Sequence, residues 1–112
     1  MPGFPGSPFA NAVAFHCQQA AEKYLKAFLV WSEVDFPKTH DLKELLNLAE
    51  PVSRELAVGL KNVIVLTRYG VDLRYPGDRP DAALEEAREA VEMALQVRDA
   101  VLPLLPHGSP GQ

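Results

Sequence analysis

Residues 15–29 read FHCQQAAEKYLKAFL, and this stretch decides the predicted fold. Apolar side chains recur through it and just beyond it at spacings of three and four, which is typical of one face of an α-helix. This apolar stripe consists of Val13, Cys17, Ala20, Tyr24, Phe28 and Trp31, widened by Ala21 and Leu25. A second face is polar and consists of Gln19, Glu22, Lys23 and Lys26. The stretch therefore predicts a long amphipathic helix whose apolar stripe faces the core.

Ten prolines mark the places where helices cannot continue. Proline in a helix interior costs about 3 kcal/mol, so a helical protein keeps its prolines at junctions. The chain has four proline-free stretches, which span residues 9–36, 38–50, 52–75 and 81–102. We predict one helix in each, and hence an all-α fold, an up-and-down bundle of about four helices.

The three later stretches carry helix signals of their own. Asp41, followed three residues later by Glu44, resembles a capping box at the start of the second helix. The predicted buried residues are Leu42, Leu45, Leu46 and Ala49 in the second helix, and Leu84, Ala87, Val91, Ala94, Leu95, Val101 and Leu102 in the fourth. The third stretch is apolar on two faces, so we expect its helix to lie centrally or to contact a partner.

The length of 112 residues suits a single domain. We expect a proline-rich N-terminal stub at 1–8, a helical domain at 9–103 and a disordered tail at 104–112. The second helix is too short to cover its neighbours, and the third is apolar on two sides. Both features leave apolar surface uncovered, so the sequence predicts a homodimer.

Composition excludes several classes of protein. The net charge of −4 argues against a surface that binds nucleic acid or anionic lipid everywhere, while a local basic patch stays open. Cys17 is the only cysteine, so an intrachain disulfide is excluded and a reducing cytoplasm is the expected location. No apolar run approaches the roughly 20 residues of a membrane span, so we expect no membrane contact.

Familiar catalytic and cofactor motifs are absent from the sequence. The chain has no GxxxxGKS/T loop, no GxGxxG turn, no HExxH pair and no GxSxG elbow. His16 and Cys17 are adjacent on the predicted helix and diverge by about 100°, which is poor geometry for one metal ion. We therefore expect no cofactor and no metal site.

Basic residues on two predicted helices suggest a phosphate-binding groove. Lys23 and Lys26 on the first helix could face Arg68 and Arg74 on the third if the two helices are antiparallel. Two plainer interpretations stay open. The polar face of the first helix can be a solvated surface, or Gln19, Lys23 and Arg74 can form an internal polar network.

Three motifs resemble those of a known family. They are FHxQQAxEKxxKAxL at residues 15–29, THDLxxL at 39–45 and RYP at 74–76. The combination resembles a HEPN domain (higher eukaryotes and prokaryotes nucleotide-binding) over roughly residues 10–102. This resemblance implies an all-α bundle that commonly dimerises and that in prokaryotes often stands beside a minimal nucleotidyltransferase in toxin and antitoxin pairs. Some members bind nucleotides and others cut RNA.

Residue chemistry sets the expected site within this resemblance. We expect Lys23, Lys26, Arg68 and Arg74 to contact phosphate, Tyr75 to stack on a base and His40 to give a hydrogen bond. At His40, local capping of the second helix is the plainer alternative. We accordingly expect a nucleotide or RNA ligand, or a nucleotidyltransferase partner.

The chain departs from the family pattern in two respects. Ribonuclease members use an arginine followed after four to six residues by a histidine, and no arginine here has that neighbour. Tyr75 stands where the histidine could be, but a phenol with an ordinary pKa near 10 is a poor base at neutral pH. The expected role is therefore binding without catalysis. The alternatives are a divergent metal-independent ribonuclease using Arg68 or Arg74 with Tyr75 or His40, and a purely structural dimerisation module.

The second departure concerns residues 1–8, where family members usually have a further helix. We expect either a truncated start or a partner that covers the surface this helix would have occupied.

Overall fold

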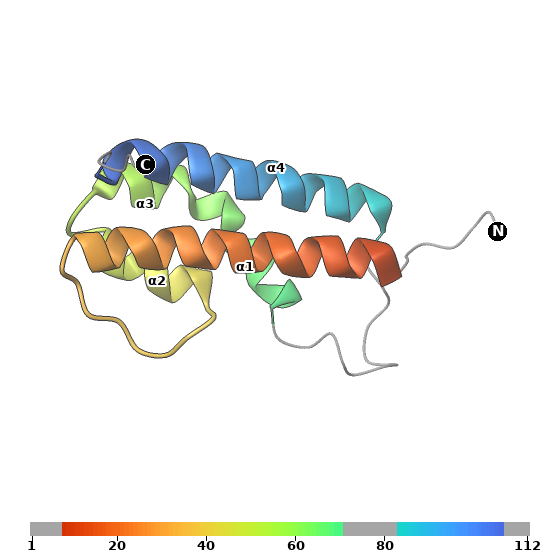
Figure 1. Cartoon of the computed structure of the whole chain (residues 1–112), viewed down its shortest axis with the longest axis horizontal. Coiled ribbons are helices and arrows are strands. Elements are labelled where there is room, and N and C mark those ends of the chain that lie inside the picture. Colours follow the sequence, from red (N-terminus) through yellow and green to blue (C-terminus); the bar gives the residue numbers. More distant parts are fainter. Residues whose placement is uncertain (1–7, 71–82, 107–112) are drawn as a thin grey trace.

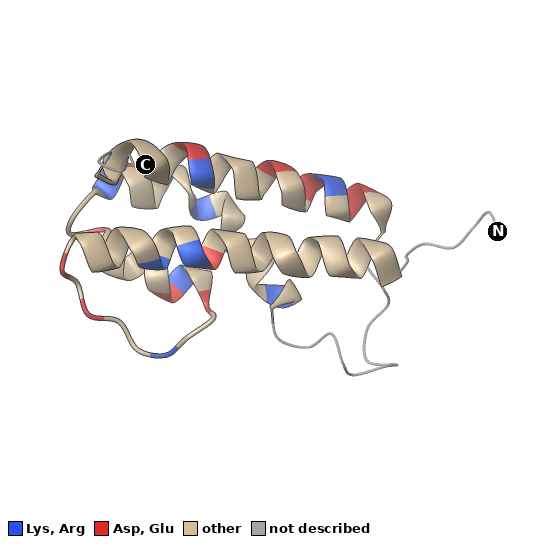
Figure 2. Ribbon diagram, viewed as in Figure 1, with Lys and Arg blue, Asp and Glu red and all other residues tan. Residues whose placement is uncertain are grey.

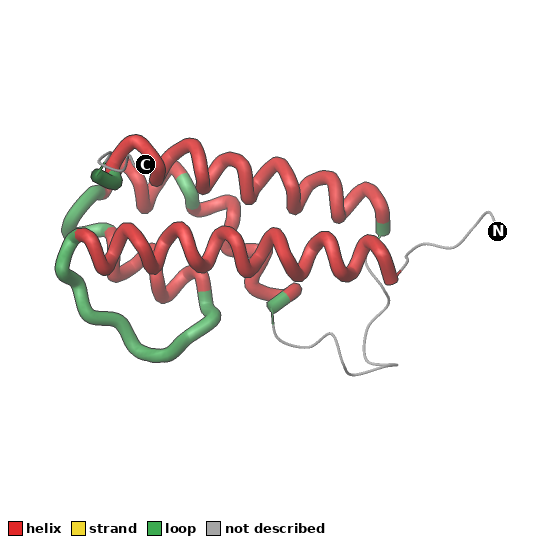
Figure 3. Tube along the Cα trace, in the orientation of Figure 1, coloured by secondary structure: helices red, strands yellow, loops and turns green. Residues whose placement is uncertain are grey.

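The computed structural model describes residues 8–70 and 83–106, and within these ranges it contains helices, turns and loops but no strand (Figure 3). The elements in chain order are α1 (Pro8–Trp31), α2 (Leu42–Ala49), α3 (Arg54–Gly59), the 3-10 helix η1 (Lys61–Tyr69), α4 (Leu84–Val101) and the 3-10 turn η2 (Leu102–Leu104). The protein is an all-α helical bundle, as the sequence predicted. Among the described helices, none combines the length and the apolar character needed to cross a bilayer.

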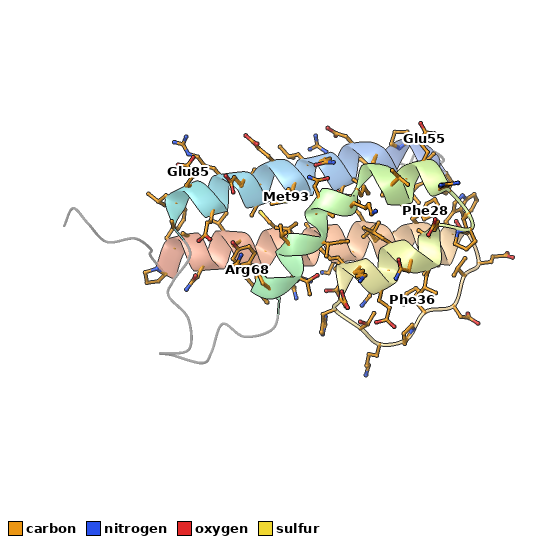
Figure 4. All side chains as sticks on the ribbon, turned by 180° about the vertical axis from the view of Figure 1, so that it is seen from behind. Phe28, Phe36, Glu55, Arg68, Glu85 and Met93 are labelled. Atoms are coloured by element: carbon orange, nitrogen blue, oxygen red, sulfur yellow. The ribbon has the colours of Figure 1, made fainter. Side chains whose placement is uncertain are left out.

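The long helices α1 and α4 lie side by side, and the rest of the fold packs against this pair (Figure 1). The shorter elements α2, α3 and η1 gather on one side of this pair, which is best seen from behind (Figure 4). The core lies between them. Its largest fully buried apolar side chains are Leu25, Leu29, Leu42, Leu45, Leu60, Val63, Leu66, Val97 and Val101.

The second helix follows the sequence prediction closely. The Asp41 side chain accepts a hydrogen bond from the Lys43 backbone N–H at 3.0 Å and caps the first turn. The predicted apolar side is buried in full and consists of Leu42, Leu45, Leu46 and Ala49. The N-cap and the apolar spacing of α2 are therefore confirmed. The predicted capping box is not, because the Asp41 backbone N–H donates to Thr39 Oγ1 at 3.1 Å instead of to Glu44.

The face of α1 that is buried in the core lies beside the predicted apolar stripe, displaced by about one residue position. Of the predicted stripe, Ala21, Leu25 and Phe28 are buried as expected. Val13, Cys17, Ala20 and Tyr24 are only half-buried, and Trp31 is 56% exposed. The residues that α1 buries are Ala10, Ala14, Gln18, Ala21, Glu22, Leu25, Phe28 and Leu29. Both sides of α1 are rich in apolar residues, so hydrophobic spacing alone could not choose between them.

The third stretch does not form one continuous helix, which corrects the prediction for residues 52–75. It breaks at Leu60 (φ −107°, ψ 13°), where α3 ends and the tighter η1 begins. Gly59 stands at the break, and glycine in a helix is about 1 kcal/mol less favourable than alanine. The β-branched run 63–65 follows directly and weakens the helix further. Residues 71–75 lie outside the described ranges.

Helix α4 buries a different face from the predicted one. Ala87 and Val101 are buried as predicted, but Leu84, Val91, Leu95 and Leu102 are between 38% and 61% exposed. The side toward the core consists of Ala87, Ala90, Val97 and Val101. The small alanines let α4 pack closely against α1, and the larger leucines are left on the outside.

Candidate functional site

Glu22 is the centre of a polar cluster on the core side of α1. Although Glu22 is only 6% exposed, its carboxylate has three side-chain partners. Lys26 Nζ lies 2.7 Å from Oε2, and His40 Nδ1 lies 3.1 and 3.0 Å from Oε1 and Oε2. Gln18 Nε2 donates to Oε1 at 3.0 Å. A single buried carboxylate thus brings together Lys26 and His40, two of the residues predicted for nucleotide binding.

Helix periodicity and one loop explain this arrangement. Gln18, Glu22 and Lys26 follow one another at spacings of four and therefore share one face of α1. His40 arrives from the loop between α1 and α2, which turns back where Glu33 adopts a left-handed backbone conformation (φ 62°). Gln18 Nε2 also donates to the His40 carbonyl at 3.3 Å, so the backbone of His40 is held as well as its ring.

The end of η1 closes the other side of the cluster. Thr67 Oγ1 accepts the Leu42 backbone N–H at 3.1 Å, which joins η1 to the start of α2. Gly70 lies against the Gln18 amide so closely that a Cβ at Gly70 would stand 2.6 Å from the Gln18 amide carbon. The middle of α1, the start of α2 and the end of η1 therefore meet at one corner. We call Gln18, Glu22, Lys26 and His40 the polar corner.

The charges of the polar corner are set by its contacts. Burial raises the pKa of Glu22, but hydrogen bonds from Lys26, His40 and Gln18 outweigh burial and hold the pKa below its ordinary value. Glu22 is therefore ionised at neutral pH, and its charge is balanced by Lys26. His40 is half-exposed, with 57% of its side chain accessible, and its Nδ1 faces Glu22. The other ring nitrogen, Nε2, lies on the edge of the ring away from the carboxylate and can donate to or accept from a ligand.

The other predicted residues are placed differently. Arg68 lies near the end of η1 (Figure 4), with its guanidinium 5.4 Å from the centre of the Tyr69 ring. Lys23 is exposed, and one position along a helix places it about 100° around α1 from Glu22. Arg74 and Tyr75 lie outside the described residues. The structure thus joins Lys26 to His40 and sets Lys23 apart from them.

Three features of this site were not predicted from the sequence. They are the contacts of Gln18, the burial of Glu22 and the close approach of Gly70 to Gln18. A solvated face stayed open as an interpretation for Glu22, because its spacing to Lys26 is that of an ordinary surface ion pair. A weak signal was present, because Gln18, Glu22 and Lys26 extend one line of polar residues along the helix. Gln18 Oε1 is buried and has no hydrogen-bond partner among the residues that the structure describes. Gln18 Nε2 donates to both Glu22 Oε1 and the His40 carbonyl, which fixes the orientation of the amide. Oε1 of Gln18 therefore faces away from Glu22.

The cluster lacks the features of a metal centre. Within residues 8–70 and 83–106, no three His, Cys, Asp or Glu side chains come close enough together to hold a metal ion. The polar corner instead holds Lys26 and His40 on one carboxylate, that of Glu22.

Replacing Gly70 by alanine tests the packing of the polar corner. Its backbone (φ −90°, ψ −13°) accepts any residue, so the cost of Gly70→Ala comes from displacing the Gln18 amide. We expect a loss of about 1 to 3 kcal/mol in the free energy of unfolding, measured by urea denaturation.

Gly59→Ala is the matched control, because a Cβ at Gly59 meets no atom within 4 Å. It should leave stability unchanged or raise it by up to about 1 kcal/mol. Adding Gln18→Ala to Gly70→Ala should make the two costs less than additive. Equal effects of the two glycine substitutions, or strict additivity in the double variant, would show that Gln18 is not constrained in this way.

The chain was also compared with known proteins. The family model described as the HEPN domain matches residues 7–104, whereas no curated protein and no solved structure shows significant similarity. The match spans all the helices of the described structure and includes the polar corner. The chain therefore belongs to the HEPN domain family, which relates it at a coarse level to nucleotide- and RNA-related helical modules.

Proposed function

We propose that this protein is a binding module for a nucleotide or a nucleic-acid segment. In this proposal Lys26 and His40 contact phosphate, with Arg68 and Arg74 as further cations and Tyr75 as a stacking platform. One observation carries the proposal. The buried Glu22 carboxylate holds Lys26 and His40 side by side at the polar corner, within 2.7 and 3.0 Å of the same oxygen.

Preorganisation is the physical reason for favouring this site. A lysine or histidine fixed by a buried partner loses less conformational entropy on binding than a free surface side chain. Gly70 touches Gln18, and Arg74 and Tyr75 follow Gly70 in the sequence by four and five residues. Arg74 and Tyr75 lie outside the described residues, so their part in the proposal rests on the sequence.

The partner in this proposal follows from the family. HEPN domains in prokaryotes often stand beside a minimal nucleotidyltransferase, so we infer a role as the partner of such an enzyme in a toxin and antitoxin system. The neighbouring reading frame would test this inference directly. A nucleotidyltransferase frame next to this one would support it, and an unrelated neighbour would count against it.

Calorimetric titration with ATP and with GTP tests the binding proposal. Lys26→Ala and Arg74→Ala should each weaken binding about tenfold or more, because a charge-assisted hydrogen bond contributes about 1.5 to 3 kcal/mol. Lys61→Ala, an exposed lysine at the start of η1, is the matched control and should leave the dissociation constant unchanged.

Absence of heat and of any thermal shift at millimolar nucleotide would contradict the proposal and favour a purely structural dimerisation module. Equal affinities for all three variants and the wild type would show that a ligand binds elsewhere.

A second candidate function is favoured by the geometry of His40. A histidine with Nδ1 on a buried carboxylate and Nε2 turned outward has the orientation of a general base or acid. This suits metal-independent cleavage of RNA by a divergent ribonuclease. Labelled RNA incubated without divalent metal should then be cut by the wild type and by Lys61→Ala, but at least about 100-fold more slowly by His40→Ala. Intact RNA with the wild type, or equal cutting by all three, would exclude this role for His40.

A further inference from the structure

Three helices end at the same end of the bundle. Figure 1 shows that α1, α2 and α4 run in one direction, whereas α3 and η1 run back. Ala10 packs against Ala87, which places the starts of α1 and α4 side by side as well. We call the opposite end, where α1, α2 and α4 finish at Trp31, Ala49 and Val101, the carboxyl end of the bundle. Each helix dipole places partial negative charge at its carboxyl terminus, so parallel helices gather negative charge there.

Side chains at the carboxyl end add to this negative charge. Neither α1 nor α2, as the structure describes them, has a basic residue in its last turn. Arg98 in the last turn of α4 is paired with Asp99 at 3.0 Å. The start of α3 with Arg54 offsets part of the charge, and Lys38 lies further along the loop that follows α1.

The acidic residues at this end are all exposed. Figure 2 shows acidic positions on the loop that follows α1, close to the end of that helix. The exposed acidic residues at or next to the helix ends are Glu33, Asp35, Glu50, Glu55 and Asp99. A helix carboxyl terminus is stabilised by nearby lysine or arginine. The carboxyl end of this bundle therefore attracts basic groups from outside the chain.

Exposed apolar side chains lie among these charges. They are between 44% and 65% exposed and consist of Val30, Trp31, Val52, Leu102 and Leu104. Each belongs to the last turn of one of the three helices or to the few residues that follow it. Exposed apolar side chains that gather on a soluble domain mark an interaction surface. The carboxyl end thus combines apolar contact area with negative charge.

A cavity opens at this end, between α3 and the end of α4. Its volume is about 340 Å³, and its apolar walls consist of Leu56, Leu60, Ala100 and Leu104. Gly59 lines it without a side chain, and a Cβ at Gly59 would meet no atom of the described residues within 4 Å. Gln96 also lines the cavity, and its Nε2 donates to the Gly59 carbonyl at 3.0 Å. Glu55 is a further lining residue. The cavity has room for a leucine or phenylalanine side chain, with a carboxylate beside it.

We propose that the carboxyl end of the bundle binds a basic segment of a partner protein. An apolar side chain of that segment enters the α3–α4 cavity, and its lysines or arginines lie over the helix ends and the acidic residues. Charge selects this occupant, because a negative surface repels nucleic acid and anionic lipid and attracts a basic peptide. The site is separate from the polar corner, since Glu22 precedes the end of α1 by about 13 Å of helix.

Trp31 tests the proposal without any variant, because it is the only tryptophan of the chain and lies at this end. Caesium ions should quench its fluorescence more strongly than iodide ions do, relative to the same pair of ions on free N-acetyltryptophanamide, because negative charge attracts the cation. Titration with a lysine-rich peptide that has leucine and phenylalanine at its centre should shift the Trp31 emission to shorter wavelengths. The same peptide with glutamate in place of each lysine should leave the emission unchanged.

Two variants test the cavity and the charge beside it, with binding followed by the fluorescence anisotropy of the labelled lysine-rich peptide. Gly59→Leu should weaken binding at least about tenfold, because the new side chain occupies the cavity. Leucine favours a helix more than glycine does, so this variant should keep its helix content by circular dichroism. Glu55→Lys should weaken binding at least about threefold, and added salt should weaken binding by the wild type.

Glu85→Lys is the matched control for Glu55→Lys. Both glutamates stand in the first turn of a helix, and Figure 4 shows them at opposite ends of the molecule. Glu85→Lys should therefore leave the peptide dissociation constant unchanged. Equal effects of the two lysine variants, or tight binding by folded Gly59→Leu, would overturn the proposal.

The wild type alone can also contradict it. Equal binding of the lysine and glutamate peptides, or no change in Trp31 emission at millimolar lysine peptide, would overturn the proposal whatever the variants do. A Trp31 emission that shifts with protein concentration in the absence of peptide would assign this surface to a second copy of the chain. A shift with phosphatidylserine vesicles and not with the peptide would assign it to a lipid surface. Either result would overturn the proposed basic partner.

Discussion

The buried carboxylate of Glu22 is the interaction on which the functional surface depends. A charged group taken out of water costs several kcal/mol unless close partners compensate. Gln18, Lys26 and His40 supply that compensation. Because His40 comes from the loop before α2, satisfying Glu22 also fixes the path of that loop. The same requirement thus joins the middle of α1 to the start of α2 and leaves a lysine and a histidine at the surface in defined positions.

Much of the fold followed from the sequence, because prolines and capping residues act locally. The prolines separate the helices, and Asp41 predicts where α2 begins. The sequence could not predict which of two similarly apolar faces of α1 is buried in the core. Val13 and Cys17 on one side of α1, and Ala14 and Ala21 on the other, have nearly equal apolar character, so only tertiary packing decides between them. Gly59 ends α3 within a stretch that otherwise reads as one helix.

Only part of the site could be predicted, because its other contacts depend on tertiary packing. Lys26 and His40 were chosen by residue type and by family resemblance, and the structure places both at the polar corner. The role of Glu22 could not be read from the sequence, because its spacing to Lys26 equally describes a surface pair. Its burial depends on contacts distant in the chain, including Gly70 against Gln18. Val91 and Leu95 of α4 were likewise assigned to the core, although both are exposed and line an apolar groove between α1 and α4.

The structure therefore separates two surfaces on opposite sides of α1, one polar and ordered by Glu22, the other apolar and open. The most direct test of this account is to follow the Glu22 carboxyl carbon by NMR as the pH is lowered. Hydrogen bonds from Lys26, His40 and Gln18 should keep its pKa below the ordinary value for glutamate, and Lys26→Ala should raise it. A Glu22 that titrates at or above the ordinary value in the wild type would contradict the account, because burial would then outweigh the partners said to hold it.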